Sequence, residues 1–173
     1  NMMNLEIGQD HIATLTFEVK EKPVNVIDQK FIDDFSDQVK KIVNDANIKG
    51  LIITSARDEF IAGGDLEMLR NISNATECME LGNIFHQALR SLELWPCPVV
   101  AALTGTTLGG GYELALGANW RICVDQKRAQ IGLPEVNLGL LPGGGGTQRL
   151  PRIIGVQNSL PFLTLGKKVN PKV

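Results

Sequence analysis

Two glutamates stand in apolar surroundings, each close to a glycine-bearing turn. Glu113 follows three consecutive glycines in TLGGGYELALGANW, and Glu135 follows a proline in GLPEVNLG. A carboxylate is costly to bury unless it is paired, hydrogen-bonded or held neutral, so each either faces solvent or has a function. Two such carboxylates are suited to acid–base chemistry on a water molecule, with one accepting a proton and the other donating one. For Glu135 alone, an exposed loop position is an equally good interpretation.

The glycine clusters do not have the sequence of a phosphate-binding loop. A P-loop needs Lys and then Ser or Thr after its last glycine, and the dinucleotide fingerprint needs G-x-G-x-x-G; LGGGYEL and PGGGGTQ have neither. The nucleophile elbow G-x-S-x-G is also absent. Glycines at a helix start instead expose backbone N–H groups, which is what an oxyanion hole requires. The alternative is a tight turn with close helix packing.

A second donor is expected in EFIAGGDLEML, residues 59–69. Small residues, Ala62, Gly63 and Gly64, follow the apolar stretch LIITS there, and Asp65 is placed to cap the next helix. The two glycine-bearing turns together therefore predict two backbone donors for one developing negative charge.

The elements that must position these residues alternate between strands and helices, which predicts an α/β architecture. Apolar residues recur every three or four positions from Gln29 to about Asn44, typical of an amphipathic helix. It lies between two predicted strands, which gives a strand–helix–strand unit. We expect strands at 11–17, 51–55, 98–103 and 120–124, and helices at 29–44, 77–94, from the glycine cluster to about 117–119, and from about 146.

Composition excludes several classes of protein. The 173 residues are 43% hydrophobic, enough for one domain with a core, and the net charge is -2. That charge offers no electrostatic basis for nucleic acid or an anionic membrane as the main partner, and no apolar segment reaches the length of a membrane span. The odd number of cysteines and their spacing predict neither a disulfide framework nor a zinc site, and the two histidines lie far apart, so no metal is expected.

Three segments resemble, in order and spacing, signature segments of the crotonase (enoyl-CoA hydratase/isomerase) superfamily. They are FIAGGDLEML, GTTLGGGYELALG and GLPEVNLGLLPGGGGTQRLPRIIGV. The stretch between the two glutamates is similar in length and character to the hydratase region of multifunctional fatty-acid oxidation alpha chains. The resemblance covers nearly the whole chain, from KPVNVID onward. It implies a spiral of ββα units with the active site between the two turns.

The resemblance also implies a role for individual residues. Ala62 and Gly110 would be the backbone donors to the thioester oxygen of a trans-2-enoyl-CoA, and Glu113 and Glu135 would be the catalytic pair. Glu113 would assist removal of a proton from water, and Glu135 would protonate the alpha carbon. The turn formed by Ala62, Gly63, Gly64 and Asp65 would line the path of the CoA moiety.

The same resemblance carries expectations beyond the site. One domain over residues 1–173 is expected, truncated at its C-terminus, with the family's closing helices missing. No cofactor is expected, since acyl-CoA is the substrate; NAD would enter only with a dehydrogenase region in a full-length protein, and a thiolase beta subunit would be its partner. A cytoplasmic location is expected, or the mitochondrial matrix for a eukaryotic protein.

Two alternatives remain open. One is an isomerase that shifts a 3-enoyl-CoA double bond, with Glu135 as the proton shuttle. The other is a non-catalytic acyl-CoA binder.

Overall fold

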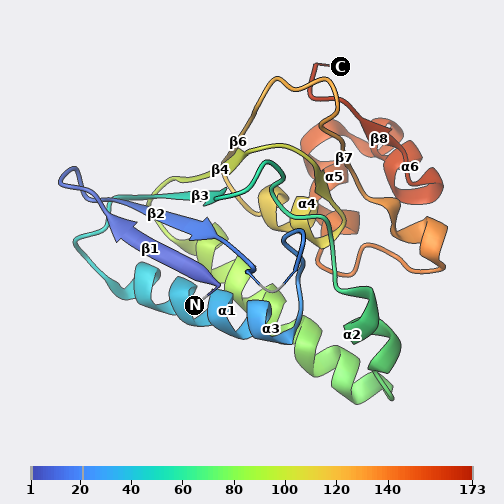
Figure 1. The fold of residues 1–173 in the computed structure, drawn as a ribbon, viewed down its shortest axis with the longest axis horizontal. Coiled ribbons are helices and arrows are strands. Elements are labelled where there is room, and N and C mark those ends of the chain that lie inside the picture. Colours follow the sequence, from blue (N-terminus) through green and yellow to red (C-terminus); the bar gives the residue numbers. More distant parts are fainter. Residues whose placement is uncertain (1, 21, 173) are drawn as a thin grey trace.

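The computed structural model describes residues 2–20 and 22–172 as an α/β fold with two sheets (Figure 1). The five-stranded sheet has the order β1-β2-β3-β4-β6 and contains β1 (Met3–Ile7), β2 (Ile12–Phe17), β3 (Gly50–Ser55), β4 (Val99–Leu103) and β6 (Trp120–Cys123). A small sheet joins β5 (Thr107–Leu108), β7 (Ile131–Gly132) and β8 (Lys168–Val169). The helices are α1 (Gln29–Asn44), α2 (Leu66–Asn71), α3 (Ala75–Leu94), α4 (Gly110–Leu116), the 3-10 helix η1 (Pro134–Leu138), α5 (Gly146–Ile154) and α6 (Val156–Leu165).

The main sheet begins with an antiparallel hairpin and continues in parallel. β1 pairs with β2 antiparallel, whereas β2–β3, β3–β4 and β4–β6 are parallel pairs. A helix is therefore needed between parallel neighbours, and α1 supplies it between β2 and β3. This confirms the predicted strand–helix–strand unit, and β1, β2 and α1 together form a ββα unit.

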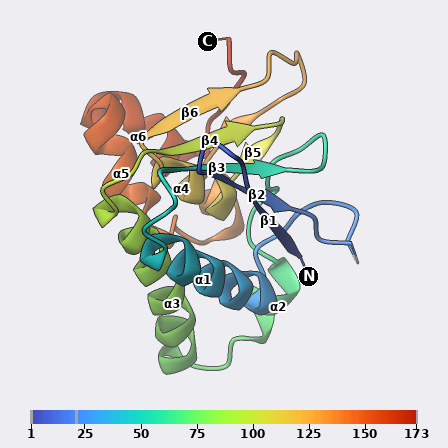
Figure 2. The ribbon, with the colours of Figure 1, turned by 90° about the vertical axis from the view of Figure 1, so that its left-hand side faces the viewer.

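Helices α1 and α3 lie together against one face of the main sheet (Figure 2). Every second residue of β2 and β4 is buried, as expected for strands with one covered face. The core beneath the sheet is aromatic: the Phe17 ring lies 5.1 Å from that of Phe31, and a tilted pair joins Phe35 to Phe85 at 6.2 Å. Among the described residues no helix is both long and apolar enough to cross a bilayer.

The turns after β3 and after β4 are brought together because parallel strands end at the same edge of a sheet. Isolated bridges join Ile27 to Gly64 and Ile61 to Thr107. A Cβ built on Gly109 would lie 3.6 Å from the Cα of Gly63, so the two turns touch. The φ of 53° at Gly109 and of 125° at Gly63 lie in the region that favours glycine. The fold thus juxtaposes the two glycine-bearing turns.

The predicted elements agree with the structure to within a few residues. Asp65 caps α2, accepting a hydrogen bond from Met68 N at 2.9 Å, as its position before the helix predicts. The glycine- and proline-rich stretch folds into η1 and the start of α5. The sequence analysis missed β1 and the two-residue strands of the small sheet. The two-residue strands are too short to show a periodicity.

Candidate active site

Glu113 is buried in the first turn of α4, with 3% of its surface exposed. Its Oε1 accepts a hydrogen bond from the backbone N–H of Gly146 at 2.7 Å. Gly146 is the first residue of α5, so the carboxylate caps the positive end of that helix. The solvent-facing interpretation of this glutamate is therefore wrong, and its charge is met by backbone donors.

Opposing influences act on the pKa of Glu113. Burial is the largest and raises the pKa, and the N–H groups of Gly146, Gly144 and Gly145 together with the Arg149 charge lower it, leaving the pKa above its ordinary value. The glycines are needed for close approach. A Cβ on Gly144 would lie 2.6 Å from Glu113 Oε2, and a Cβ on Gly146 would lie 3.0 Å from Oε1. The 143–146 glycine loop is thus a cradle for a carboxylate.

Glu135 lies at the start of η1, partly buried, beside the glycine turn after β5. A Cβ on Gly109 would lie 3.0 Å from its Oε1, and its Oε2 is buried without a hydrogen-bond partner among the described residues. Burial raises the pKa of Glu135 to about 7, its own backbone N–H opposes this, and the charge of Glu113 raises it further.

Glu113 and Glu135 are 22 positions apart in the sequence. The charge of Glu113 acts on the Glu135 carboxyl in the fold, so the structure brings the two predicted glutamates together.

The predicted donor at Ala62 is wrong. Its backbone N–H donates to Asn25 O at 2.9 Å and is therefore used by the fold. In the parallel bridge between Ile27 and Gly64, Ile27 N donates to Gly63 O and Asp65 N donates to Ile27 O, both at 2.9 Å. In such a bridge the N–H of the central residue, Gly64, points to the opposite side. The available donor of this turn is that of Gly64.

Gly110, the predicted donor on the other turn, lies where its N–H faces out of the helix start. It is the first residue of α4, so its N–H has no acceptor four residues earlier within the helix. Gly109 N donates to Gly132 O at 3.0 Å and Glu113 N to Gly109 O at 3.0 Å, which fixes the turn on both sides of Gly110. A Cβ on Gly111 would lie 2.6 Å from that of Ile61, so α4 packs closely on the segment that leads into the first turn.

Asp65 and Lys22 form an ion pair beside the first turn. Asp65 is 8% exposed and also caps α2, so it supports the turn that contains Gly63 and Gly64. No group of three or more His, Cys, Asp or Glu side chains that could hold a metal ion is found within residues 2–20 and 22–172.

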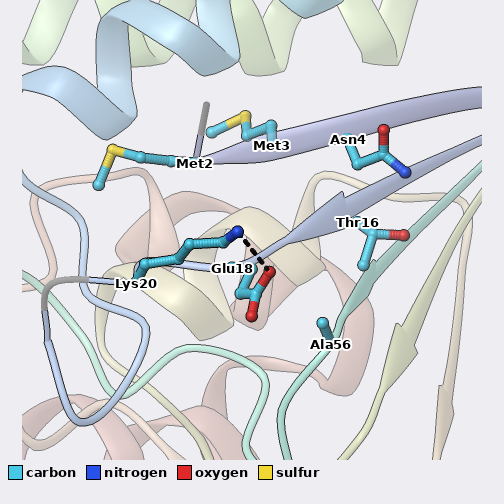
Figure 3. Close-up of a pocket in the computed structure, with 7 residues that line it drawn as sticks. All are labelled: Met2, Met3, Asn4, Thr16, Glu18, Lys20 and Ala56. Carbon is cyan, nitrogen blue, oxygen red and sulfur yellow. Dashed lines mark ion pairs between the residues drawn. The ribbon is translucent and has the colours of Figure 1, made fainter.

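A separate hollow of about 450 Å³ lies on the β1 and β2 side of the main sheet (Figure 3). Neither Glu113 nor Glu135 lines this hollow. Its lining residues include Lys20 and Glu18, whose charged groups are 3.9 Å apart at the surface. The candidate active site is placed at Glu113 and Glu135 and not in this hollow, because carboxyl groups with perturbed pKa values are the better marker of a reactive site.

A family described as enoyl-CoA hydratase/isomerase matches residues 8–172 of the chain. The chain belongs to the enoyl-CoA hydratase/isomerase family. It is 44% identical over 170 residues to the fatty acid oxidation complex subunit alpha of Shewanella halifaxensis, and 43% identical over 170 residues to that of Shewanella frigidimarina. These matches cover 98% of the chain but 24% of each relative.

Solved structures of this enoyl-CoA hydratase/isomerase fold superimpose closely. An enoyl-CoA hydratase from Bacillus anthracis has a TM-score of 0.89 at 29% identity, covering 99% of this chain and 66% of that one. A structure described as an enoyl-CoA hydratase from Geobacillus kaustophilus has a TM-score of 0.92 at 32% identity, covering 99% of this chain and 64% of that one. The crotonase-like spiral of ββα units is thereby confirmed.

The sequence analysis missed Arg149 and Glu93. Arg149 Nε donates to Glu93 Oε1 at 2.6 Å, and Arg149 Nη1 donates to Gly144 O at 2.9 Å. No local pattern marks this pair, because the two residues are 56 positions apart and belong to α5 and α3. The available signal is the run of four glycines at 143–146, which indicates close approach of the backbone to another group.

The raised pKa of Glu135 predicts a pH-dependent stability. The unfolded chain loses this proton near pH 4.5 and the folded chain near pH 7, so its contribution is fully present below pH 4.5 and is lost as the pH rises to about 7. The displacement corresponds to at most about 3 kcal/mol, reduced by partial exposure. We expect Glu135→Gln to lessen the fall in urea-unfolding free energy between pH 4.5 and 7. The exposed control Glu67→Gln should keep it, and an unchanged slope in Glu135→Gln would contradict the assignment.

Proposed function

We propose that the chain provides the active site of an enoyl-CoA hydratase, which adds water to a trans-2-enoyl-CoA to give a 3-hydroxyacyl-CoA. The observation that carries the proposal is the coupled pair Glu113 and Glu135 beside two backbone donors, Gly64 and Gly110. Membership of the enoyl-CoA hydratase/isomerase family supports it. The alpha-subunit relatives support a place in fatty-acid oxidation, as part of a longer multifunctional chain.

The donors at Gly64 and Gly110 would bind the thioester oxygen and stabilise the charge that develops on it. One oxyanion donor typically contributes about 2.7 to 4 kcal/mol. This polarises the double bond and makes its beta carbon open to attack by water. The proposed pair replaces Ala62 with Gly64 and keeps Gly110 from the sequence analysis.

The two carboxyl groups would divide the proton transfers. Glu113, whose carboxylate is held by the N–H of Gly146, takes a proton from water as the oxygen bonds to the beta carbon. The electrons of the double bond pass to the thioester, forming an enolate. Glu135 then gives its proton to the alpha carbon, a role suited to a pKa of about 7 and to its unpartnered Oε2.

The proposed reaction needs no cofactor. NAD would be required only by a dehydrogenase region elsewhere in a full-length protein, and a thiolase beta subunit is the partner we propose for that protein. The turn containing Gly63, Gly64 and Asp65 is proposed to line the CoA path.

A second reaction, conversion of a 3-enoyl-CoA into the 2-enoyl form, is favoured by one observation. Glu135 has a pKa of about 7 and a buried oxygen without a partner, so it can take a proton from one carbon and return it to another. Both activities can share this site.

The test uses the intact protein with each substrate in turn. Hydration should remove the absorbance of the conjugated enoyl thioester, whereas isomerisation of a 3-enoyl-CoA should create it. Calorimetric titration with a saturated acyl-CoA measures binding separately. Binding without either absorbance change would contradict the enzymatic proposal and support a non-catalytic binder.

A further inference from the structure

Arg149 connects three parts of the fold that meet at Glu113. It lies on α5, and its side chain is 15% exposed. It donates from Nε to Glu93 Oε1 of α3 at 2.6 Å and from Nη1 to Gly144 O at 2.9 Å. One guanidinium therefore ties α3 and α5 to the 143–146 glycine loop. A charge-assisted bond of this length and burial is stronger than one between neutral groups.

The contact with Gly144 O determines where the loop's donors point. The peptide between Gly144 and Gly145 is planar and trans, so its C=O and N–H point in opposite directions. Because Arg149 holds the C=O on one side, the Gly145 N–H is directed to the other, and it acts there on the Glu113 carboxylate. A Cβ on Gly145 would collide with the guanidinium, so this contact also requires glycine.

We propose that Arg149 is a positioning residue for Glu113: by binding Gly144 O and the Glu93 carboxylate together, it fixes the glycine loop with its N–H groups facing the Glu113 carboxylate. Glu93 anchors Arg149 in turn and has a second cationic neighbour in Arg90, 3.4 Å away. The proposal rests on the proposed function for its catalytic consequence, but the geometry of the loop does not depend on turnover.

The charged groups that face Glu113 come from two neighbouring elements. α5 contributes Arg149, whose charge favours the ionised carboxylate, and η1 contributes Glu135, whose charge opposes it. Glu93 of α3 acts through Arg149. Removing Arg149 would both withdraw a favourable charge and release the peptide that directs the Gly145 N–H, so both losses favour the protonated form of Glu113.

The experiment compares Arg149→Met with Arg152→Met in the intact protein. Arg152 is an exposed arginine one turn away. Its hydrogen bonds to described residues stay within α5, to Gln148 O at 2.6 Å and to the side chain of Gln148 at 3.3 Å. The first readout is the NMR titration of the Glu113 side-chain carboxyl carbon, which requires no activity. We expect Arg149→Met to raise the pKa of Glu113 by about 1 to 2, and Arg152→Met to leave it unchanged.

The second readout is the pH profile of hydration. Arg149→Met should lower kcat about 10- to 100-fold with little change in KM, and move the acid limb of kcat to higher pH. Glu93→Gln should shift both readouts in the same direction by less, and it serves if the Met variant does not fold. Arg149→Lys keeps the charge but cannot bind Glu93 and Gly144 O at the same time with a planar guanidinium, so we expect kcat and the Glu113 titration to lie between those of wild type and Arg149→Met.

An unchanged Glu113 titration in a folded Arg149→Met protein, even with a lower melting temperature, would overturn the proposal and leave Arg149 a structural residue. Absence of hydration in the wild-type protein would contradict the proposed function instead. The NMR titration still tests the positioning of Glu113 in that case, so the two failures are distinguishable.

Discussion

Glutamine at position 113 is expected to slow hydration of a trans-2-enoyl-CoA by about 10²- to 10⁴-fold, because an amide cannot accept the proton of water. The fold should persist, since the amide oxygen can still accept the Gly146 N–H that Glu113 Oε1 binds at 2.7 Å. The measurement is the initial rate at which the absorbance of the conjugated thioester falls, using the intact protein at saturating substrate.

The matched control for Glu113→Gln is Glu80→Gln, an equivalent change at an exposed position of α3. It should leave the rate unchanged. Binding of a saturated acyl-CoA, measured by calorimetry, should be nearly equal in wild type and both variants, because the catalytic effect belongs to the transition state. Turnover close to that of wild type in Glu113→Gln would exclude this carboxylate as the base.

Local patterns were sufficient for the elements that carry the site. The apolar spacing in 29–44 predicted α1 with its observed bounds, and the alternation in 11–17 predicted β2. Asp65 was recognised as a cap because a short polar side chain before a helix can accept from its first turn. These features depend on neighbours within a few residues, so one sequence reveals them.

The choice between Ala62 and Gly64 could not be made in the same way. Successive backbone N–H groups along an extended segment point to opposite sides. The N–H groups of residues two positions apart, such as Ala62 and Gly64, would therefore point to the same side in a regular strand. Gly63 breaks that rule with a φ of 125°. The pairing of this segment with Asn25 and Ile27 decides the matter, and nothing in IAGGD encodes it.

The cradle around Glu113 depends on contacts that are distant in sequence. The bond from Gly146 N spans 33 positions, and the one between Arg149 and Glu93 spans 56. Four successive glycines indicate close approach of the backbone to something, but not to what. The packing of α4 against α5 is what places the Glu113 carboxylate beside these glycines.

Proline at position 64 is expected to reduce hydration by about 10²- to 10³-fold, because it removes the N–H that we propose as an oxyanion donor. The residue before it, Gly63, adapts to proline more readily than other residues. The control is Gly64→Ala, which keeps the N–H. Its Cβ would lie 3.5 Å from Leu69 Cδ1, an ordinary contact, so the rate should stay close to that of wild type.

Ala62→Pro separates the two possible donors. The Ala62 N–H donates to Asn25 O, so its loss should lower the free energy of unfolding by about 1 kcal/mol or more in urea. If Gly64 is the donor, Gly64→Pro loses rate at saturating substrate while remaining folded, and Ala62→Pro loses mainly stability. A folded Gly64→Pro enzyme with full kcat would contradict this assignment and show that the donor lies at another position of the turn. Because a missing oxyanion contact raises the barrier without removing either carboxylate, Gly64→Pro should also retain the pH profile of the wild-type enzyme.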